Sequence, residues 1–188
     1  MKRISEYDGT LLNHLQGFYR AGDRALAIEL VKALGLACVE VPISGTFSLL
    51  RVHANAKDLD TVDNVIFLTE VGQRQAALEA LLQKRMATDP ELNDAVSQYR
   101  DSARTHGDGH PHLGLRFPTT AALESVLERL RTELSPALRE RVSMVEMPPY
   151  GQVADFPDIR QIFVYTDVFT FGSATYGQVI ELQVKRGA

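Results

Sequence analysis

Several residue types are scarce or absent in this chain of 188 residues, and each absence narrows its function classes. Tryptophan is absent and aromatic residues make up only 7%, which disfavours a base-stacking surface for single-stranded nucleic acid. The formal net charge is -4, so there is no excess of basic residues to attract nucleic acid or an anionic membrane. We therefore expect neither nucleic acid nor a membrane as a partner.

Cysteine occurs once, as Cys38 in the apolar run LACVEV, so no intramolecular disulfide can form and a reducing compartment is expected. In such a run, cysteine is typically a small buried hydrophobic residue. The first ten residues carry no apolar segment typical of a signal peptide. No apolar run reaches the roughly 18 residues that a membrane span requires. These features together predict a cytoplasmic protein.

Three common catalytic motifs are also missing: G-x-S-x-G, the P-loop and G-x-G-x-x-G. Hydrophobic residues make up 45% and charged residues 23%, the usual balance of a globular protein. A chain of this length is expected to form one compact domain or two small, closely packed halves.

The chain contains an internal repeat of a strand, a turn and an amphipathic helix. The first copy reads QGFYRAGDRALAIELVKAL (16–34) and the second reads HLGLRFPTTAALESVLERLRTEL (112–134). Each unit closes with a similar apolar strand, DNVIFLTE (63–70) and GQVIELQ (177–183). A repeat this long gives each chemical group in one copy a corresponding position in the other.

Strand, turn and helix signals predict the order β-α-β-β-β twice. In the first unit, strands are expected at 11–20, 37–43, 47–53 and 63–70, with a helix from Asp23 to about residue 34 and a Ser44-Gly45 hairpin. In the second unit, a helix follows Pro118, and strands are expected at 141–147, 160–169 and 177–184, with a break at 148–151. The predicted class is α+β, with modules at 1–72 and 111–188 and a helical connector at 73–110, all in one compact domain.

The segments RAGDRALAIELVKALGL, HLGLRF and GQVIEL, in this repeated order, resemble the vicinal oxygen chelate superfamily. That superfamily includes glyoxalases, extradiol dioxygenases and bleomycin-resistance proteins. The resemblance implies two βαβββ modules whose mixed sheets curl into a cup. It also implies a divalent metal (Fe, Ni, Zn or Mn), held by residues of the first and last strand of each module. Some antibiotic-binding members hold no metal, so a metal-free protein is the alternative.

Carried onto this chain, the resemblance places His112 and Glu181 at the two ligand positions of the second module. In the first module, Gln16 takes the first-strand position and Phe67 takes the last-strand position, where phenylalanine cannot coordinate a metal. A shift of two residues would replace Gln16 by His14, which lies on the same strand face. A set of two histidines and one carboxylate is typical of non-haem Fe(II) oxygenases.

Alternation along the last strand puts Val179, Glu181 and Gln183 on one face, which fits either a solvated outer face or a polar interior. Besides Phe67, the residues Tyr165 and Asp167 are candidates for substrate contact. Tyr150 and Tyr176, which lie beside glycines near strand ends, are weaker candidates.

These residues predict a glyoxalase-like or dioxygenase-like enzyme whose metal activates a substrate that chelates through two adjacent oxygens. Glu181 would be the catalytic residue, as a ligand that also exchanges protons, as in glyoxalases. The alternative is a metal-free protein that binds an antibiotic or aromatic ligand in an apolar cleft. A third reading is an interaction domain that uses its connector helices, within 73–104. We expect a small-molecule partner and a homodimer.

Overall fold

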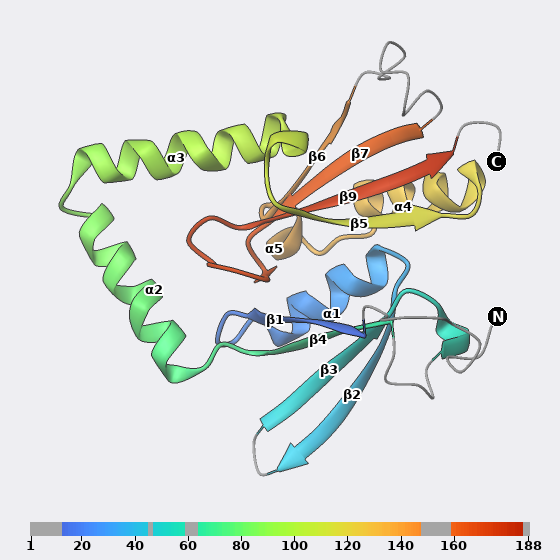
Figure 1. Cartoon of the computed structure of the whole chain (residues 1–188), viewed down its shortest axis with the longest axis horizontal. Coiled ribbons are helices and arrows are strands. Elements are labelled where there is room, and N and C mark those ends of the chain that lie inside the picture. Colours follow the sequence, from blue (N-terminus) through green and yellow to red (C-terminus); the bar gives the residue numbers. More distant parts are fainter. Residues whose placement is uncertain (1–12, 45–46, 59–63, 148–158, 186–188) are drawn as a thin grey trace.

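The computed structural model describes residues 13–44, 47–58, 64–147 and 159–185 (Figure 1). Tyr150, Gly45 of the expected hairpin and the predicted break at 148–151 lie outside these ranges. Among the described residues, no helix is long and apolar enough to span a membrane.

The first half of the chain forms a mixed sheet with one helix packed against it. Its chain turns at Gly22, where φ is 83°, a conformation that glycine adopts without the steric cost of a Cβ atom. The sheet has the strand order β2-β3-β4-β1-β8, with β1 parallel to β4. The elements are β1 (His14–Tyr19), α1 (Arg24–Ala33), β2 (Ala37–Ser44), β3 (Phe47–His53), the 3-10 turn η2 (Ala56–Asp58) and β4 (Val65–Glu70).

The second half forms another mixed sheet, with the strand order β5-β9-β7-β6 and with β5 parallel to β9. Its main helix begins after Thr119, whose side chain accepts a hydrogen bond from the backbone N–H of Ala122 at 3.1 Å, the usual role of an N-cap threonine. The elements are β5 (His112–Phe117), α4 (Thr120–Thr132), α5 (Pro136–Arg139), β6 (Val142–Glu146), β7 (Ile159–Thr166), β8 (Phe169–Thr170) and β9 (Gln178–Lys185).

The predicted α+β class with mixed sheets is confirmed, but the expected curled cup is wrong. The chain forms two sheets, of five and four strands, and neither is curled or closed. The short strand β8 was not predicted. The expected strand 160–169 ends at Thr166, whose hydroxyl accepts a hydrogen bond from the Val168 N–H at 3.1 Å. The chain then pairs antiparallel with β1, Phe18 opposite Thr170 and Tyr19 opposite Phe169.

One core serves both halves. Helices α1 and α4 contact each other, and their apolar sides share a core with one face of each sheet. Leu30 of α1 and Leu127 of α4 are buried, as are Leu68 of β4 and Leu182 of β9. Burying one leucine side chain contributes about 1.5–3 kcal/mol, so the halves depend on each other for stability.

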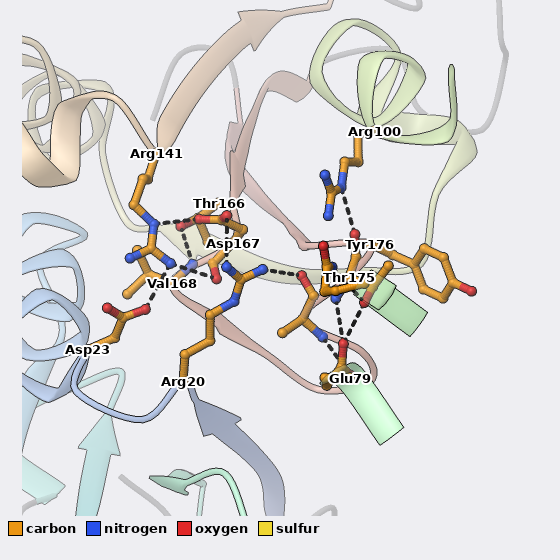
Figure 2. A network of polar contacts seen from close by, with 12 residues as sticks. Arg20, Asp23, Glu79, Arg100, Arg141, Thr166, Asp167, Val168, Thr175 and Tyr176 are labelled. Atoms are coloured by element: carbon orange, nitrogen blue, oxygen red, sulfur yellow. Dashed lines mark hydrogen bonds and ion pairs between the residues drawn. The ribbon is translucent and has the colours of Figure 1, made fainter. Parts of the chain in front are cut away.

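An arginine–carboxylate network also joins the halves (Figure 2). Arg141 pairs with Asp23 of the first half at 2.8 Å and with Asp167 of the second at 2.7 Å. Burial alone would lower the pKa of Arg141, but the hydrogen bonds and charges of both aspartates outweigh burial and raise that pKa. Arg20 adds a longer contact to Asp167, at 3.6 Å.

The connector contains the expected helices, α2 (Gln73–Met86) and α3 (Pro90–Thr105), followed by the 3-10 turn η3 (Gly107–Gly109). Asp89 is the N-cap of α3, and its carboxylate accepts a hydrogen bond from the Leu92 N–H at 3.1 Å. The two helices form an arm from the first sheet to the second (Figure 1). The end of α3 packs on the second sheet, where Ala103 joins Phe163, Tyr165 and Val179 in a small separate core.

Candidate functional site

The pairing register of the second sheet brings two of the predicted site residues together. In the parallel pair β5·β9, His112 lies opposite Val179, and Gly114 lies opposite Glu181. Glu181 is two residues beyond Val179, so His112 and Glu181 lie on the same face of the sheet. The Nε2 atom of His112 lies 3.5 Å from Oε2 of Glu181. The predicted pairing of a histidine and a carboxylate in this half is thus present.

The other ring nitrogen of His112 identifies the tautomer. Its Nδ1 atom lies 2.7 Å from the carbonyl oxygen of His110, and a carbonyl can only accept a hydrogen bond. Nδ1 therefore carries the proton, and in a neutral ring Nε2 presents a lone pair to Glu181. Two lone pairs repel each other, so the contact with an ionised Glu181 is favourable only with a proton or a cation between the two atoms.

Glu181 is buried, with 5% of its surface exposed. The amide of Gln161 donates to its Oε1 atom, and the amide of Gln183 donates to its Oε2 atom at 3.3 Å. The guanidinium of Arg116 donates to the amide oxygen of Gln183, which fixes that amide. A buried carboxylate requires such partners. Glu181 therefore lies in a buried polar patch, whereas His112 and Arg116 on the same face of β5 are exposed. Alternation alone could not distinguish these two environments.

The connector covers this face beside the carboxylate. A Cβ atom on Gly107 of η3 would lie 2.5 Å from Cβ of Phe163, so the η3 backbone rests directly on that side chain. The guanidinium of Arg104 lies 4.7 Å from the ring centroid of Tyr165. The ring of His112 packs edge-on against Phe163 at 5.4 Å. Glu181 is buried because this segment and its aromatic partners exclude water from the sheet.

A pocket of about 400 Å³ opens beside His112. The side chain of His112 is 30% exposed, whereas the side chain of Glu181 is 7% exposed. The histidine therefore lies between a solvent-accessible pocket and a buried carboxylate. The pocket is lined by residues of the first half, the connector and the second half, among them Leu15, Tyr99, His112, Phe171 and Tyr176.

The first-half candidates lie apart from this pair in all their described contacts. His14 is exposed, and its ring packs on Phe67 with centroids 5.2 Å apart. Gln16 is also exposed and donates to the carbonyl of Gly17 at 3.0 Å and to the hydroxyl of Thr69 at 3.5 Å. Within the ranges that the structure describes, no group of three or more His, Cys, Asp or Glu side chains could hold a metal ion.

Tyr165 and Asp167, the other predicted substrate contacts, differ in environment. Tyr165 is buried under Arg104, and burial raises the pKa of its hydroxyl, which donates to the carbonyl of Tyr176 at 3.3 Å. Asp167 follows the end of β7 and belongs to the Arg141 network. Tyr165 thus supports the pocket loop, and Asp167 joins the two halves.

Sequence reasoning missed Gln161 and Tyr99. Gln161 lies on the same face of β7 as Phe163 and Tyr165, so alternation along IRQIFVYT could have indicated it. Tyr99 belongs to the connector, whose position against the second sheet no local pattern predicts. Cys38 is half-buried. Burial raises the pKa of its thiol, and the nearby negative charge of Glu40 raises it further. The thiol therefore stays protonated at neutral pH.

No protein-family model, no curated protein and no solved structure matches this chain. The functional argument therefore rests on the residues of the site.

Proposed function

We propose that the chain is a small-molecule enzyme of the vicinal oxygen chelate type, in which His112 and Glu181 hold a divalent metal. One observation carries the proposal. His112 donates its Nδ1–H to a backbone carbonyl and directs Nε2 at a buried carboxylate oxygen 3.5 Å away. Metal-ligating histidines characteristically donate their second ring nitrogen in this way, which fixes the tautomer.

The residues fit a divalent ion as a partial ligand set. Ligand atoms about 2.1 Å from a shared ion lie at most about 4.2 Å apart, and the observed 3.5 Å is within that limit. Gln161, whose amide already contacts the other oxygen of Glu181, is the candidate for a third donor if its amide rotates. Fewer protein ligands leave more positions for substrate oxygens, which a chelating substrate requires.

A bound divalent ion would supply Lewis-acid activation of a substrate carbonyl or hydroxyl. The chain's own residues supply the rest. Glu181 would move a proton, since it is a buried carboxylate 3.5 Å from His112, which lines the pocket. The amides of Gln161 and Gln183 donate to its two oxygens and fix its orientation. His112 keeps a single tautomer because the His110 carbonyl cannot donate.

We also propose that the two halves are copies of one βαβββ module. The strand orders β2-β3-β4-β1 and β6-β7-β9-β5 correspond, and both first strands run parallel to the last. The two registers match when the leading HL of β1 is aligned with that of β5. The corresponding residues are then His14 with His112, Gln16 with Gly114, Val65 with Val179, and Phe67 with Glu181. The register thus supports His14, rather than Gln16, as the counterpart of His112.

A metal-free binding protein is the second candidate. Phe67 occupies the position that corresponds to Glu181, and the described residues hold no third acidic, histidine or cysteine ligand. In that case, a proton rather than a metal lies between His112 and Glu181, and the pocket binds its ligand without chemistry.

Metal analysis of the purified chain separates the two. After repletion with Fe(II), Ni(II), Zn(II) or Mn(II), we expect about one ion per chain in the wild type and loss of that ion in His112→Ala and Glu181→Gln. His106→Ala is the matched control, because His106 is exposed and contacts Thr105 instead. Equal metal content in all four proteins, or none in the wild type, would sink the metal proposal.

A further inference from the structure

The connector helix supplies part of the pocket beside His112. Tyr99 of α3 lines it from one side, and Phe171 and Tyr176 line it from the loop between β8 and β9. The arm that joins the two halves therefore also contributes to the candidate site. The repeated modules alone would leave this side of the pocket open.

Tyr99 and Tyr176 present their rings to solvent at this pocket. They are 39% and 38% exposed, and they are the aromatic members of the four large hydrophobic side chains that are exposed among the described residues. Their ring centroids lie 5.4 Å apart at an interplanar angle of 61°. Edge-on packing of this kind leaves part of each ring face free for another aromatic group.

Both rings are held in place by neighbouring contacts. Tyr99 packs edge-on against the ring of His110 at 4.7 Å. The residue before Tyr176 is clamped by the connector (Figure 2): Glu79 accepts from the N–H of Thr175 at 2.9 Å and from its hydroxyl at 2.6 Å, and Arg100 donates to its carbonyl at 2.6 Å. Rings that are already positioned lose little entropy when a ligand binds.

We propose that this pocket binds a ligand with a planar aromatic ring, which packs against Tyr99 and Tyr176 with its oxygen substituents next to His112. The ring subsite is defined by the two tyrosines, while the role of the substituents rests on the proposed function of His112 and Glu181. The substrate class is thus an oxygen-substituted aromatic compound. The determinants of ring specificity lie on the connector arm and the loop that it clamps.

Binding of three small probes to the full chain tests this proposal. Phenol has a ring and one oxygen, catechol has a ring and two adjacent oxygens, and cyclohexanol has no aromatic ring. With chelator present, we expect phenol to bind more tightly than cyclohexanol, as measured by NMR titration. Tyr99→Leu and Tyr176→Leu should each weaken phenol binding by about tenfold, because stacking on one ring contributes about 1–3 kcal/mol. Tyr99→Phe and Tyr176→Phe, which keep the ring, should bind phenol as the wild type does.

The probes separate this inference from the function on which it rests. A metal-dependent gain for catechol over phenol tests the metal proposal, whereas phenol binding in chelator tests the ring subsite alone. The inference is overturned if phenol does not bind, if phenol and cyclohexanol bind equally, or if the leucine variants bind phenol like the wild type. Retained phenol binding without any catechol gain would remove the metal but leave the ring subsite standing.

Discussion

The sheets of the two halves have similar strand orders, yet Phe67 of the first sheet and Glu181 of the second differ in burial. In the second half, Glu181 is 5% exposed beneath a connector that rests on Phe163. In the first half, Phe67, which we propose as the counterpart of Glu181, is half-buried. The first-strand histidines do not differ in this way, since His14 and His112 are both exposed. A similar strand order therefore does not by itself bury a side chain at this position. The connector, which rests on only one of the two sheets, accounts for the difference.

This difference in burial determines which partners a carboxylate needs on each sheet. A carboxylate withdrawn from water needs donors, and Glu181 has two glutamine amides. On the open face of the first sheet, a carboxylate would be solvated and only weakly coupled to a neighbouring histidine. We therefore attribute the burial of Glu181 to the position of the connector over the second sheet. Variants in either half test this explanation.

The largest effect is expected from Gly107→Ala, which separates the connector from the second sheet. The added methyl would lie 2.5 Å from Cβ of Phe163, so η3 must move away. Overpacking of this kind costs about 1–3 kcal/mol, measured as the free energy of unfolding in urea. Gly109→Ala is the matched control in the same turn, since no atom lies within 4 Å of its added Cβ. Equal stability of the two variants would contradict the covering role of η3.

The next prediction compares Gly17 of β1 with Gly114 of β5, the first strand of each half. In Gly17→Ala, the new Cβ would lie 2.7 Å from the carbonyl oxygen of Thr170, so β8 must shift at a cost of about 1–2 kcal/mol. In Gly114→Ala, it would lie 3.3 Å from the carboxylate of Glu181, a side-chain end that can move, at a cost of about 0.5 kcal/mol.

Metal binding should show the opposite order, because only Gly114→Ala displaces a proposed ligand. We expect its metal affinity to fall about tenfold, as for disturbed ligand support, while Gly17→Ala keeps the affinity of the wild type. Urea unfolding and metal titration of both variants measure the two effects. A loss of affinity in Gly17→Ala alone would argue that the site does not lie over β5.

The sequence predicted the parts of this structure that depend on local chemistry. Helical spacing of leucines placed α1 and α4, alternation placed the strands, and the repeat indicated two corresponding halves. His112 and Glu181 were instead placed in one candidate site by the family resemblance, and the register of β5 and β9 puts them on one face.

What the sequence could not predict depends on contacts between distant segments. Strand β8 is two residues long and exists because β1 offers it an open edge, so no local pattern marks it. The burial of Glu181 depends on where η3 lies, and Tyr99 reaches the pocket only because α3 crosses the second sheet. The resemblance placed Gln16 at the first-strand position, whereas the strand registers support our proposal that His14 corresponds to His112.

A smaller effect is expected from Phe67→Glu, which gives the first half the carboxylate that it lacks. His14 already packs on this side chain, with ring centroids 5.2 Å apart, so the new carboxylate would lie beside a histidine. In a His112→Ala background, we expect weak new binding of Zn(II), with a loss of stability of about 1 kcal/mol from the half-buried ring. Phe67→Gln is the control, and zinc binding equal to that of the control would mean that the open face cannot build a site.

The smallest effect concerns the clamp between the connector and the pocket loop. Burial favours the neutral form of Glu79, but hydrogen bonds from Thr175, Ser173 and Gln75 outweigh burial and hold its pKa below the ordinary value of 4.5. A lowered folded-state pKa means that this group stabilises the fold above about pH 4.5 and that its contribution is lost as pH falls through the folded-state pKa.

Glu79→Gln removes this titration, so its stability deficit relative to the wild type should be present at about pH 6 and shrink towards about pH 3. Urea unfolding at both pH values measures it, with Glu128→Gln on the exposed side of α4 as the control. The phenol affinity should fall in the same variant, because Tyr176 follows the clamped Thr175, while Glu128→Gln should leave it unchanged. A stability deficit that grows on acidification would mean that the charge of Glu79 does not hold the loop. Arg100 of α3 would then be the contact that positions Thr175.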